Sequence, residues 1–316
     1  MKAAQIDRPG SPGLIELVYV PAPRDPGPTE VVVEVARMGI NGADLKTLTG
    51  WFPDLPYPRG LGREFSGRAI AVGSDVVTVK QGQLVVGAVE PAMQEYVVVD
   101  QHSVMPLPQG LSLEIAATLP VAGQTAWEAV QSQDVHEGDV CVVSGASGGV
   151  GHILTQLLVD KGARVIAIAR EKHHERLDAI GAIPLAWSDH LVPEIEKLTP
   201  KGIHHVFDQV GVPVIEAALE LGVPPSQINS VSGFADWFGV RSVGRIGLNE
   251  IAIEALSRMI AEGRLAVATF TFPFEQNTIQ NAFTSVKIGS YYGKAVLSTV
   301  EIDDETWSKQ FDDGPW

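Results

Sequence analysis

The glycine-rich stretch Val142–Gly151 holds the residues most able to do chemistry. It lies between an apolar run typical of a buried strand and an amphipathic helical pattern, and another strand follows about twenty residues later. Gly148 allows a pyrophosphate to approach the backbone, Gly151 allows the helix to pack closely on the strand, and the helix N-terminus offers N–H groups. The stretch therefore predicts a dinucleotide-binding turn, although Ala146 replaces the first glycine of the usual pattern. The contacts expected in it are Ala146, Ser147, Gly148, Gly149 and Val150.

The choice between NADH and NADPH is made at the end of the next predicted strand, residues 164–169. A site for NADH needs a carboxylate there for the ribose hydroxyls, but the chain has Ala169 followed by Arg170 and Lys172. A guanidinium can bind a 2′-phosphate through charge-assisted hydrogen bonds. We therefore expect NADPH as the cofactor, with Arg170 and Lys172 as contacts. Glu171 leaves a ribose contact open, and a solvated helix start is the alternative interpretation of the basic residues.

The composition of the chain limits the kinds of molecule that can bind to it. The chain has 316 residues, a formal net charge of −15 and one cysteine. That charge repels nucleic acids and anionic membranes, and the sequence has no long basic run to offset it. A single cysteine allows neither an internal disulfide framework nor a thiolate zinc cage. The chain also lacks an apolar signal segment and a long apolar span, so we expect a cytoplasmic protein with a small-molecule substrate.

Two patterns of predicted secondary structure surround the glycine-rich turn. Residues 1–117 show short predicted strands separated by glycines and a proline-rich loop, which is typical of a β-rich, partly barrel-like domain. Residues 118–263 alternate apolar strands, among them 164–169 and 183–186, with amphipathic helices, the first of them over 118–131. This alternation indicates a parallel sheet covered by helices. Residues 264–316 return to short strands and are expected to rejoin the first domain. The predicted fold class is therefore α/β, with a Rossmann doubly wound sheet and a β-rich domain.

Six stretches follow a known family pattern. They are Met38–Lys46, Gly62–Gly67, Ala122–Trp127, the glycine-rich turn, His205–Gly211 and Tyr292–Leu297. Together they make the chain resemble a medium-chain dehydrogenase/reductase of the zinc-independent, quinone-oxidoreductase-like branch. The resemblance implies a GroES-like catalytic domain over 1–117 and 264–316, a Rossmann domain over 118–263, an active-site cleft between them, and hydride transfer from nicotinamide C4. It is specific for the superfamily and less specific for the substrate.

The resemblance also bears on zinc. In zinc-dependent relatives a cysteine stands at the position of Asn41 and a histidine at the position of Arg63, and neither residue found here is a plausible zinc ligand. We therefore expect no metal. Without a Lewis acid, oxidation of a simple alcohol has little support, whereas hydride addition to a quinone or to a C=C bond beside a carbonyl is the natural alternative. Trp51 stands near the position of a tyrosine proton donor in some enoyl reductases and cannot replace it.

Polar residues in the family-like stretches are the candidates for catalysis. We predict Asn41, Asp44 and Lys46 as catalytic residues, with the Asn41 amide donating beside the nicotinamide as the resemblance implies. Asp44 has the alternative role of capping a helix, and Lys46 that of an exposed helical lysine. The expected substrate pocket comprises Trp51, Tyr57 and Gln124, and the further cofactor contacts are Thr125, Val210 and Gly233. Trp51 and Tyr57 have the alternative of anchoring the proline-rich loop around them.

The predicted activity is NADPH-dependent reduction of a quinone or an activated C=C bond. Two other functions stay open: a dinucleotide-binding sensor or accessory protein with weak redox activity, and a biosynthetic enzyme that uses the same cleft for another step. The segment Gly239–Ile246 falls where family members have the edge strand of the Rossmann sheet. An exposed edge can pair with a second copy, so we expect a homodimer, unless Arg241 and Arg245 protect the edge by charge.

Overall fold

The computed structural model describes residues 1–52, 54, 56–244 and 247–300. Its backbone contacts divide the chain into two compact units, the first of Met1–Val121, Ile246–Ser257 and Ala268–Trp316, the second of Ala122–Arg245 and Arg258–Val267. The domain limits expected from the sequence, 1–117 with 264–316 and 118–263, remain a prediction, because compactness does not test independent folding. No helix in the described ranges is long and apolar enough to cross a membrane.

The first unit is built on a mixed sheet of seven strands in the described part of the chain. The strand order is β15 (Thr269–Pro273), β16 (Lys294–Ser298), β3 (Glu30–Gly39), β5 (Glu64–Val72), β6 (Leu84–Ala88) and β8 (Val104–Pro106), with β7 (Tyr96–Asp100) also paired to β3. β15 and β16 are parallel, and β3 pairs antiparallel with β5, β7 and β16. A second, three-stranded sheet has the order β2 (Glu16–Tyr19), β1 (Lys2–Ile6) and β4 (Arg59–Gly60). The long strand β3 therefore joins segments from both ends of the chain.

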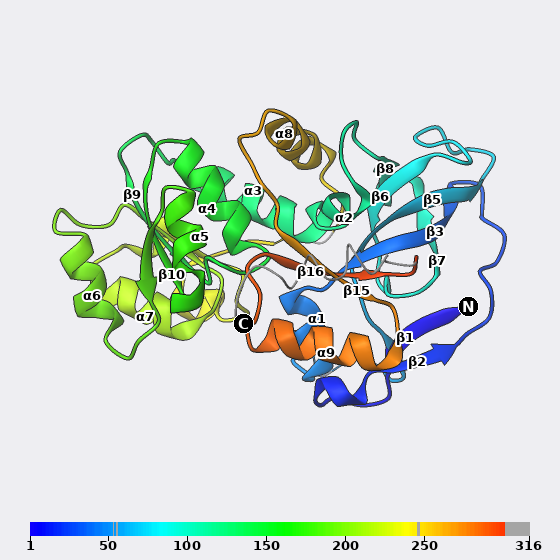
Figure 1. Cartoon of the computed structure of the whole chain (residues 1–316), viewed down its shortest axis with the longest axis horizontal. Coiled ribbons are helices and arrows are strands. Elements are labelled where there is room, and N and C mark those ends of the chain that lie inside the picture. The colour runs from blue at the N-terminus through cyan, green and yellow to red at the C-terminus, as the bar shows by residue number, and fades with distance from the viewer. Residues whose placement is uncertain (53, 55, 245–246, 301–316) are drawn as a thin grey trace. The chain divides into compact units, whose positions relative to one another are not determined.

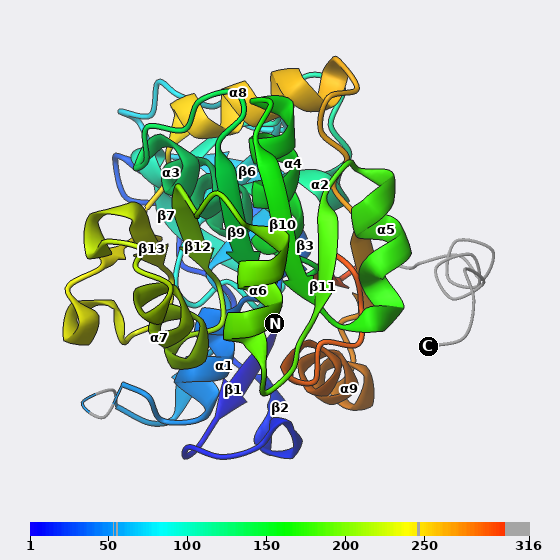
Figure 2. The same cartoon turned by 90° about the vertical axis from the view of Figure 1, so that its left-hand side faces the viewer.

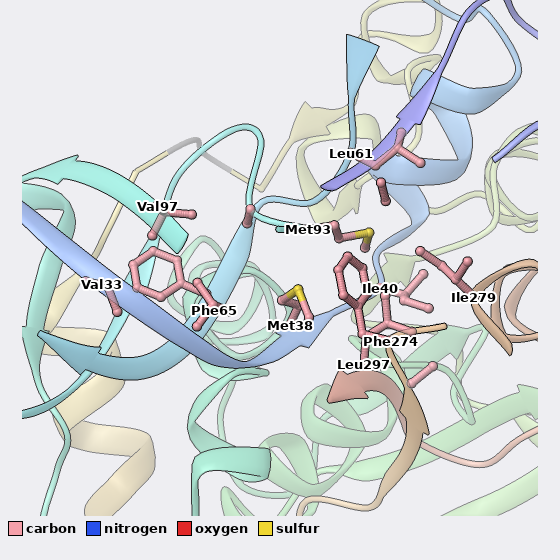
Figure 3. Packing of buried hydrophobic residues seen from close by; sticks show 14 of the residues in the cluster. Val33, Met38, Ile40, Leu61, Phe65, Met93, Val97, Phe274, Ile279 and Leu297 are labelled. Carbon is pink, nitrogen blue, oxygen red and sulfur yellow. The ribbon is translucent and has the colours of Figure 1, made fainter. Parts of the chain in front are cut away.

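The core of this unit follows from alternation along its strands. On β3, Val31, Val33 and Val35 all point into one buried cluster. Figure 3 shows the side chain of Val33 together with those of Phe65 and Val97, which come from the two strands paired with β3. Burying a side chain of this size contributes about 1.5–3 kcal/mol each, so this packing holds the paired strands in register.

Helices cover this core. They are α1 (Gly42–Leu48), α2 (Leu113–Ala116) and α9 (Gln276–Lys287), with 3-10 turns at Pro12–Leu14 and Gln101–Ser103. The sequence predicted only strands in the region of α9. The helix buries a narrow apolar stripe of Ile279, Ala282 and Phe283 within an otherwise polar segment, which explains why its periodicity was weak. Gln276 ties α9 to the N-terminal region, because its side chain bonds the carbonyl of Ile15 and the N–H of Leu17, both at 2.7 Å.

The second unit contains a parallel sheet of six described strands. Their order is β11 (Ile183–Ala186), β10 (Arg164–Ala169), β9 (Val140–Ser144), β12 (His205–Asp208), β13 (Ile228–Ser230) and β14 (Arg241–Ser242). Because every neighbouring pair is parallel, the carboxyl ends of the strands share one edge. Figure 2 shows β9, the first of these strands in the chain, between β10 and β12. This order is the doubly wound Rossmann arrangement, in which a dinucleotide binds at the carboxyl ends where the strand order reverses.

Helices alternate with these strands along the chain (Figure 1). They are α3 (Gln124–Gln131), α4 (Gly151–Asp160), α5 (His174–Ala179), α6 (Leu191–Leu198) and α7 (Val212–Glu220), with 3-10 turns at Glu171–His173, Pro225–Gln227 and Ala235–Phe238. The next helix, α8 (Glu250–Ala261), belongs to the first unit up to Ser257 and to the second unit after it. Every residue of β9 and β12 is buried, so both faces of the central sheet are covered. The α/β class with a Rossmann sheet, predicted from the sequence, is therefore confirmed.

One local prediction in this unit was inaccurate, and another was confirmed in part. One helix was expected over Thr118–Gln131, but Leu119–Gly123 forms a π-helical turn before α3 begins. Pro120 lies in that turn and has no N–H to donate to a regular helix. The edge strand expected within Gly239–Ile246 is β14, which pairs with β13 through Arg241 and Ser242, and residues 245 and 246 lie outside the described residues.

Candidate functional site

The glycine-rich turn connects β9 to α4 at the carboxyl edge of the Rossmann sheet. Gly145 has a φ of +59°, in the left-handed region that favours glycine. A Cβ atom on Gly151 would overlap the carbonyl oxygen of Gly145. The first turn of α4 can therefore pack against the end of β9 only with glycine at position 151, which agrees with the close-packing role expected of this residue.

The backbone N–H groups of the turn form two sets. Those of Ala146 and Gly148 donate to backbone carbonyls at 3.1 and 2.9 Å. No hydrogen bond among the described residues uses the N–H groups of Ser147, Gly149 or Val150. Open N–H groups at the start of a helix form an anion-binding arrangement, strengthened by the helix dipole. The turn can thus bind a phosphate through these three residues, whereas the N–H of Ala146 is already used.

A buried carboxylate organises the strand ends beside the turn. Asp208, the last residue of β12, is completely buried. Its Oδ1 accepts hydrogen bonds from the hydroxyl of Ser144 at 2.7 Å and from the N–H groups of Val210 and Gly211, both at 2.9 Å. Its Oδ2 accepts the hydroxyl of Ser230 at 2.6 Å. Asp208 therefore links the ends of β9, β12 and β13, and it occupies the N–H of the predicted cofactor contact Val210.

Two cations follow the end of β10. The strand ends in Ala169, and Arg170 and Lys172 are exposed in the turn after it. Burial, together with the nearby charge of Arg170, lowers the pKa of the Lys172 ammonium. The two cations are thus close enough to repel each other, which concentrates positive charge at this strand end. Glu171 is the acidic residue of the same turn.

In the first unit, Asn41 belongs to a buried ionic network. Lys294 of β16 is 2% exposed and Glu64 of β5 is 0% exposed, and the ammonium lies 2.8 Å from Glu64 Oε1. Asn41 Nδ2 donates to the same oxygen at 2.8 Å and to the carbonyl of Gly39 at 3.4 Å, while Asn41 Oδ1 accepts a hydrogen bond from Lys294. Glu64 Oε2 accepts the N–H of Val121 at 2.7 Å. Asn41 can therefore donate to a substrate only by exchanging one of these bonds.

Asp44 lies in the first turn of α1 and is completely buried. Its Oδ2 accepts the N–H of Asn41 at 2.8 Å, and its Oδ1 accepts Arg63 at 2.9 Å and the N–H of Gly62 at 3.2 Å. Burial raises the pKa of this carboxyl, and the charge of Arg63 opposes that rise. The environment of Asp44 is that of a helix brace, which was the alternative to its predicted catalytic role.

Lys46, Trp51 and Tyr57 follow Asn41 on the same segment of the first unit. The Lys46 ammonium lies 5.9 Å from the centroid of the Trp51 ring, within the range of a cation–π contact. Trp51 is 42% exposed, whereas Tyr57 packs against the hydrophobic cluster of this unit. Trp51 therefore presents an aromatic surface with a cation beside it, and Tyr57 anchors its loop.

The other predicted residues lie in the second unit. Gln124 and Thr125 begin α3 and are buried, and Gly233 is exposed in the loop after β13. Thr125 lies beside Gly244, because a Cβ atom there would be 3.5 Å from its methyl group. The structure therefore brings together Asn41 with Asp44, and Lys46 with Trp51, in the first unit. In the second unit the glycine-rich turn lies at the same sheet edge as Val210 and Arg170.

Three buried charged residues were missed by sequence reasoning. Glu64 and Lys294 form an ion pair between β5 and β16, and Asp208 links three strand ends. A charge inside an apolar strand pattern is expensive to bury unless it is paired or hydrogen-bonded. This rule identifies each of the three residues as a charge that needs a partner. It does not identify the partner, because the partners are distant in sequence.

Comparisons with known proteins agree with this architecture. Residues 27–109 match the family described as "Alcohol dehydrogenase GroES-like domain", and residues 149–259 match "Zinc-binding dehydrogenase". The chain is 30% identical over 234 residues to a quinone oxidoreductase of Pseudomonas aeruginosa, covering 71% of this chain and 70% of that protein. It is 27% identical over 315 residues to a 2-methylene-furan-3-one reductase of Solanum lycopersicum, covering 95% and 79%. The structure of a quinone oxidoreductase from Coxiella burnetii superposes with a TM-score of 0.83 at 28% identity, covering 95% and 99%.

Proposed function

The chain belongs to the medium-chain dehydrogenase/reductase family, in its quinone-oxidoreductase-like branch, and from that premise we propose that it reduces a quinone or an activated C=C bond with NADPH and without zinc. By this membership it is an oxidoreductase related to quinone and enoyl reductases. One observation carries the proposal. The glycine-rich turn lies at the reversal point of a Rossmann sheet, with three backbone N–H groups open to a phosphate.

The second unit fits a nicotinamide dinucleotide. We assign the pyrophosphate to the N–H groups of Ser147, Gly149 and Val150, because a negative charge is favoured where α4 begins. Val210 can offer only its carbonyl and its partly exposed side chain, since its N–H bonds Asp208. Ala146, Gly148, Thr125 and Gly233 stay predicted contacts. NADPH supplies a hydride from C4 of its nicotinamide, and the protein supplies binding and orientation.

The preference for NADPH rests on the end of β10. Ala169 offers no carboxylate to the ribose hydroxyls, and Arg170 and Lys172 place two cations beside the same position. A charge-assisted hydrogen bond to a phosphate contributes about 1.5–3 kcal/mol. We therefore expect NADPH to bind roughly ten- to a hundredfold more tightly than NADH.

Zinc independence rests on what stands at the two positions where zinc-dependent relatives carry ligands. Asn41 is held by Glu64 and Lys294, and Arg63 binds Asp44. A neutral amide is not among the usual protein ligands of zinc, and a permanently charged guanidinium has no free lone pair for a zinc ion. Among the described residues, no group of three or more His, Cys, Asp or Glu side chains is placed to hold a metal ion.

The substrate class follows from the donors that remain. Hydride addition forms a C–H bond at an electrophilic carbon and moves a π-electron pair onto a carbonyl oxygen, which a proton then neutralises. An electron-poor substrate needs less stabilisation of that oxygen than a simple ketone does. The indole of Trp51, which is 42% exposed, suits a flat conjugated molecule, and the Lys46 ammonium beside it suits a developing oxyanion. We propose Asn41 and Gln124 as further polar contacts.

Titration of NADPH and NADH by fluorescence or calorimetry tests the cofactor assignment. Arg170→Ala should weaken NADPH at least tenfold more than NADH. The matched control is Arg164→Ala, which removes the same charge from the opposite end of the same strand. Equal affinity of the wild type for both cofactors would remove the 2′-phosphate assignment.

Consumption of NADPH with a panel of quinones and conjugated enones tests the reaction. We expect turnover with electron-poor acceptors, and none with unactivated ketones or, in the reverse direction with NADP⁺, with ethanol. Tight NADPH binding without turnover on any acceptor would contradict the reductase and favour a sensor or accessory protein.

A further inference from the structure

Gln209 carries a buried carboxamide that none of the assigned roles uses. It follows β12 directly, at the carboxyl edge of the Rossmann sheet. Both its Oε1 and Nε2 atoms are buried and have no hydrogen-bond partner among the described residues. Buried side-chain amides are satisfied in the large majority of cases, so an exception needs an explanation.

The backbone around Gln209 is rigid. Its N–H donates to the hydroxyl of Ser144 at 2.8 Å, and the next two N–H groups bond Asp208. Because these three donors are engaged, the Gln209 carboxamide is the polar donor of this turn that has no partner in the described part of the chain. The turn is therefore preorganised, and one polar side chain in it lacks a partner.

The side chain also lies against the glycine-rich turn. A Cβ atom on Gly145 would be 3.3 Å from Gln209 Cβ, which is a close approach that glycine permits. Gln209 as a whole keeps partial exposure. Since its carboxamide has no hydrogen bond to lose, it can turn toward a ligand bound over Gly145 at little cost.

The strand order indicates which part of a dinucleotide this ligand is. β10, which carries Arg170 at its end, lies on one side of β9, and β12 lies on the other. A dinucleotide crosses the reversal point of such a sheet, with its two nucleosides on opposite sides of the phosphate turn. If the 2′-phosphate of adenosine binds near Arg170, the nicotinamide nucleoside lies on the side of Gln209.

We propose that the Gln209 carboxamide binds the ribose hydroxyls of the nicotinamide nucleoside, an inference that rests on the proposed dinucleotide function. Each ribose hydroxyl both donates and accepts a hydrogen bond, and a carboxamide offers one group of each kind. A phosphate is a poor match, because Oε1 is an acceptor that an anion repels. Gln209 is thus a binding residue for the second ribose and sets the position of the nicotinamide ring attached to it.

Three ligands separate the parts of the cofactor in a calorimetric titration of the whole protein. 2′,5′-ADP carries only the adenosine half, 2′-phospho-ADP-ribose adds the second phosphate and the second ribose, and NADPH adds the nicotinamide. Gln209→Leu should weaken NADPH and 2′-phospho-ADP-ribose on the order of tenfold and leave 2′,5′-ADP unchanged. The matched control is Gln227→Leu, the same change at the amino end of β13.

Thermal unfolding of the unliganded variant distinguishes binding from a structural role. Leucine replaces an unpartnered buried amide, so the Tm of Gln209→Leu should equal or exceed that of the wild type. Three results for Gln209→Leu would each overturn the ribose assignment. They are a Tm below that of the wild type, wild-type affinity for all three ligands, and a loss of affinity restricted to NADPH. If the wild type binds neither 2′,5′-ADP nor NADPH, the proposed function itself fails.

Discussion

Removing one partner of the ion pair between Lys294 and Glu64 is expected to destabilise the first unit strongly. Lys294→Met keeps most of the side-chain length and removes the ammonium that lies 2.8 Å from Glu64 Oε1. Glu64 then keeps the amide of Asn41 and the N–H of Val121 as donors, but no counter-ion. Because the carboxylate is completely buried, neither water nor a dissolved cation can compensate its negative charge.

The size of the effect follows from that burial. Breaking a buried pair by removing one member costs about 3–5 kcal/mol, since the remaining charge stays uncompensated. Solvent screening does not reduce this cost, because both side chains are almost fully enclosed. The two remaining hydrogen bonds place the expected loss near the lower limit, about 3 kcal/mol. Adding Glu64→Gln removes the orphaned charge and keeps an oxygen for the Val121 N–H, so the double variant should recover most of the loss.

Urea unfolding of the unliganded variants, followed by circular dichroism, measures these free energies. Lys287→Met is the control, because Lys287 is exposed in the last turn of α9 and its loss should change stability by less than about 0.5 kcal/mol. A loss below about 1 kcal/mol for Lys294→Met would refute the buried-charge reasoning. So would a double variant that is no more stable than the single one.

Three further outcomes are expected. Burial, with the negative charge of Asp139 as a smaller cause, raises the pKa of the Cys141 thiol to about 12. A thiol reagent at pH 8 should therefore label the native chain very slowly and label one cysteine per chain in denaturant, whereas fast native labelling contradicts the burial. Elemental analysis of untagged protein should find no stoichiometric zinc, and one zinc per chain that is lost together with activity on chelation would overturn the zinc-free proposal. Light scattering at micromolar concentration should give twice the mass of one chain, and a single-chain mass would reject the homodimer.

Local patterns predicted much of the Rossmann sheet. Strands β10 and β11 have the limits expected from the sequence, because short β-branched apolar runs bounded by turns carry their own signal. The signal weakened where tertiary contacts decide the structure. Helix α9 buries few apolar residues, and β14 is a strand only through its pairing with β13.

The candidate site was predictable where neighbours in sequence build it. The glycine-rich turn is such a case, since its strand, glycines and helix are consecutive. The networks around Asp208 and Glu64 are not local. Asp208 binds Ser144, which is 64 residues away, and Asn41 binds Lys294, which is 253 residues away. The sequence shows that these residues are charged and therefore costly to bury. Only the fold identifies the partners that make their burial possible.

Asn41 shows how a prediction from the sequence combines with contacts that only the fold reveals. Sequence reasoning proposed a donor amide at this position, and the structure places the amide between an ammonium and a carboxylate. Lys294 binds the amide oxygen, so the orientation of the carboxamide is determined and its Nδ2 group faces Glu64. A buried ion pair contributes little net stability compared with apolar packing, but it imposes one geometry on the groups that it contacts. The pair therefore acts on Asn41 chiefly by positioning it, and Asn41 donates to a substrate oxygen only when that oxygen displaces Glu64 or the Gly39 carbonyl from Nδ2.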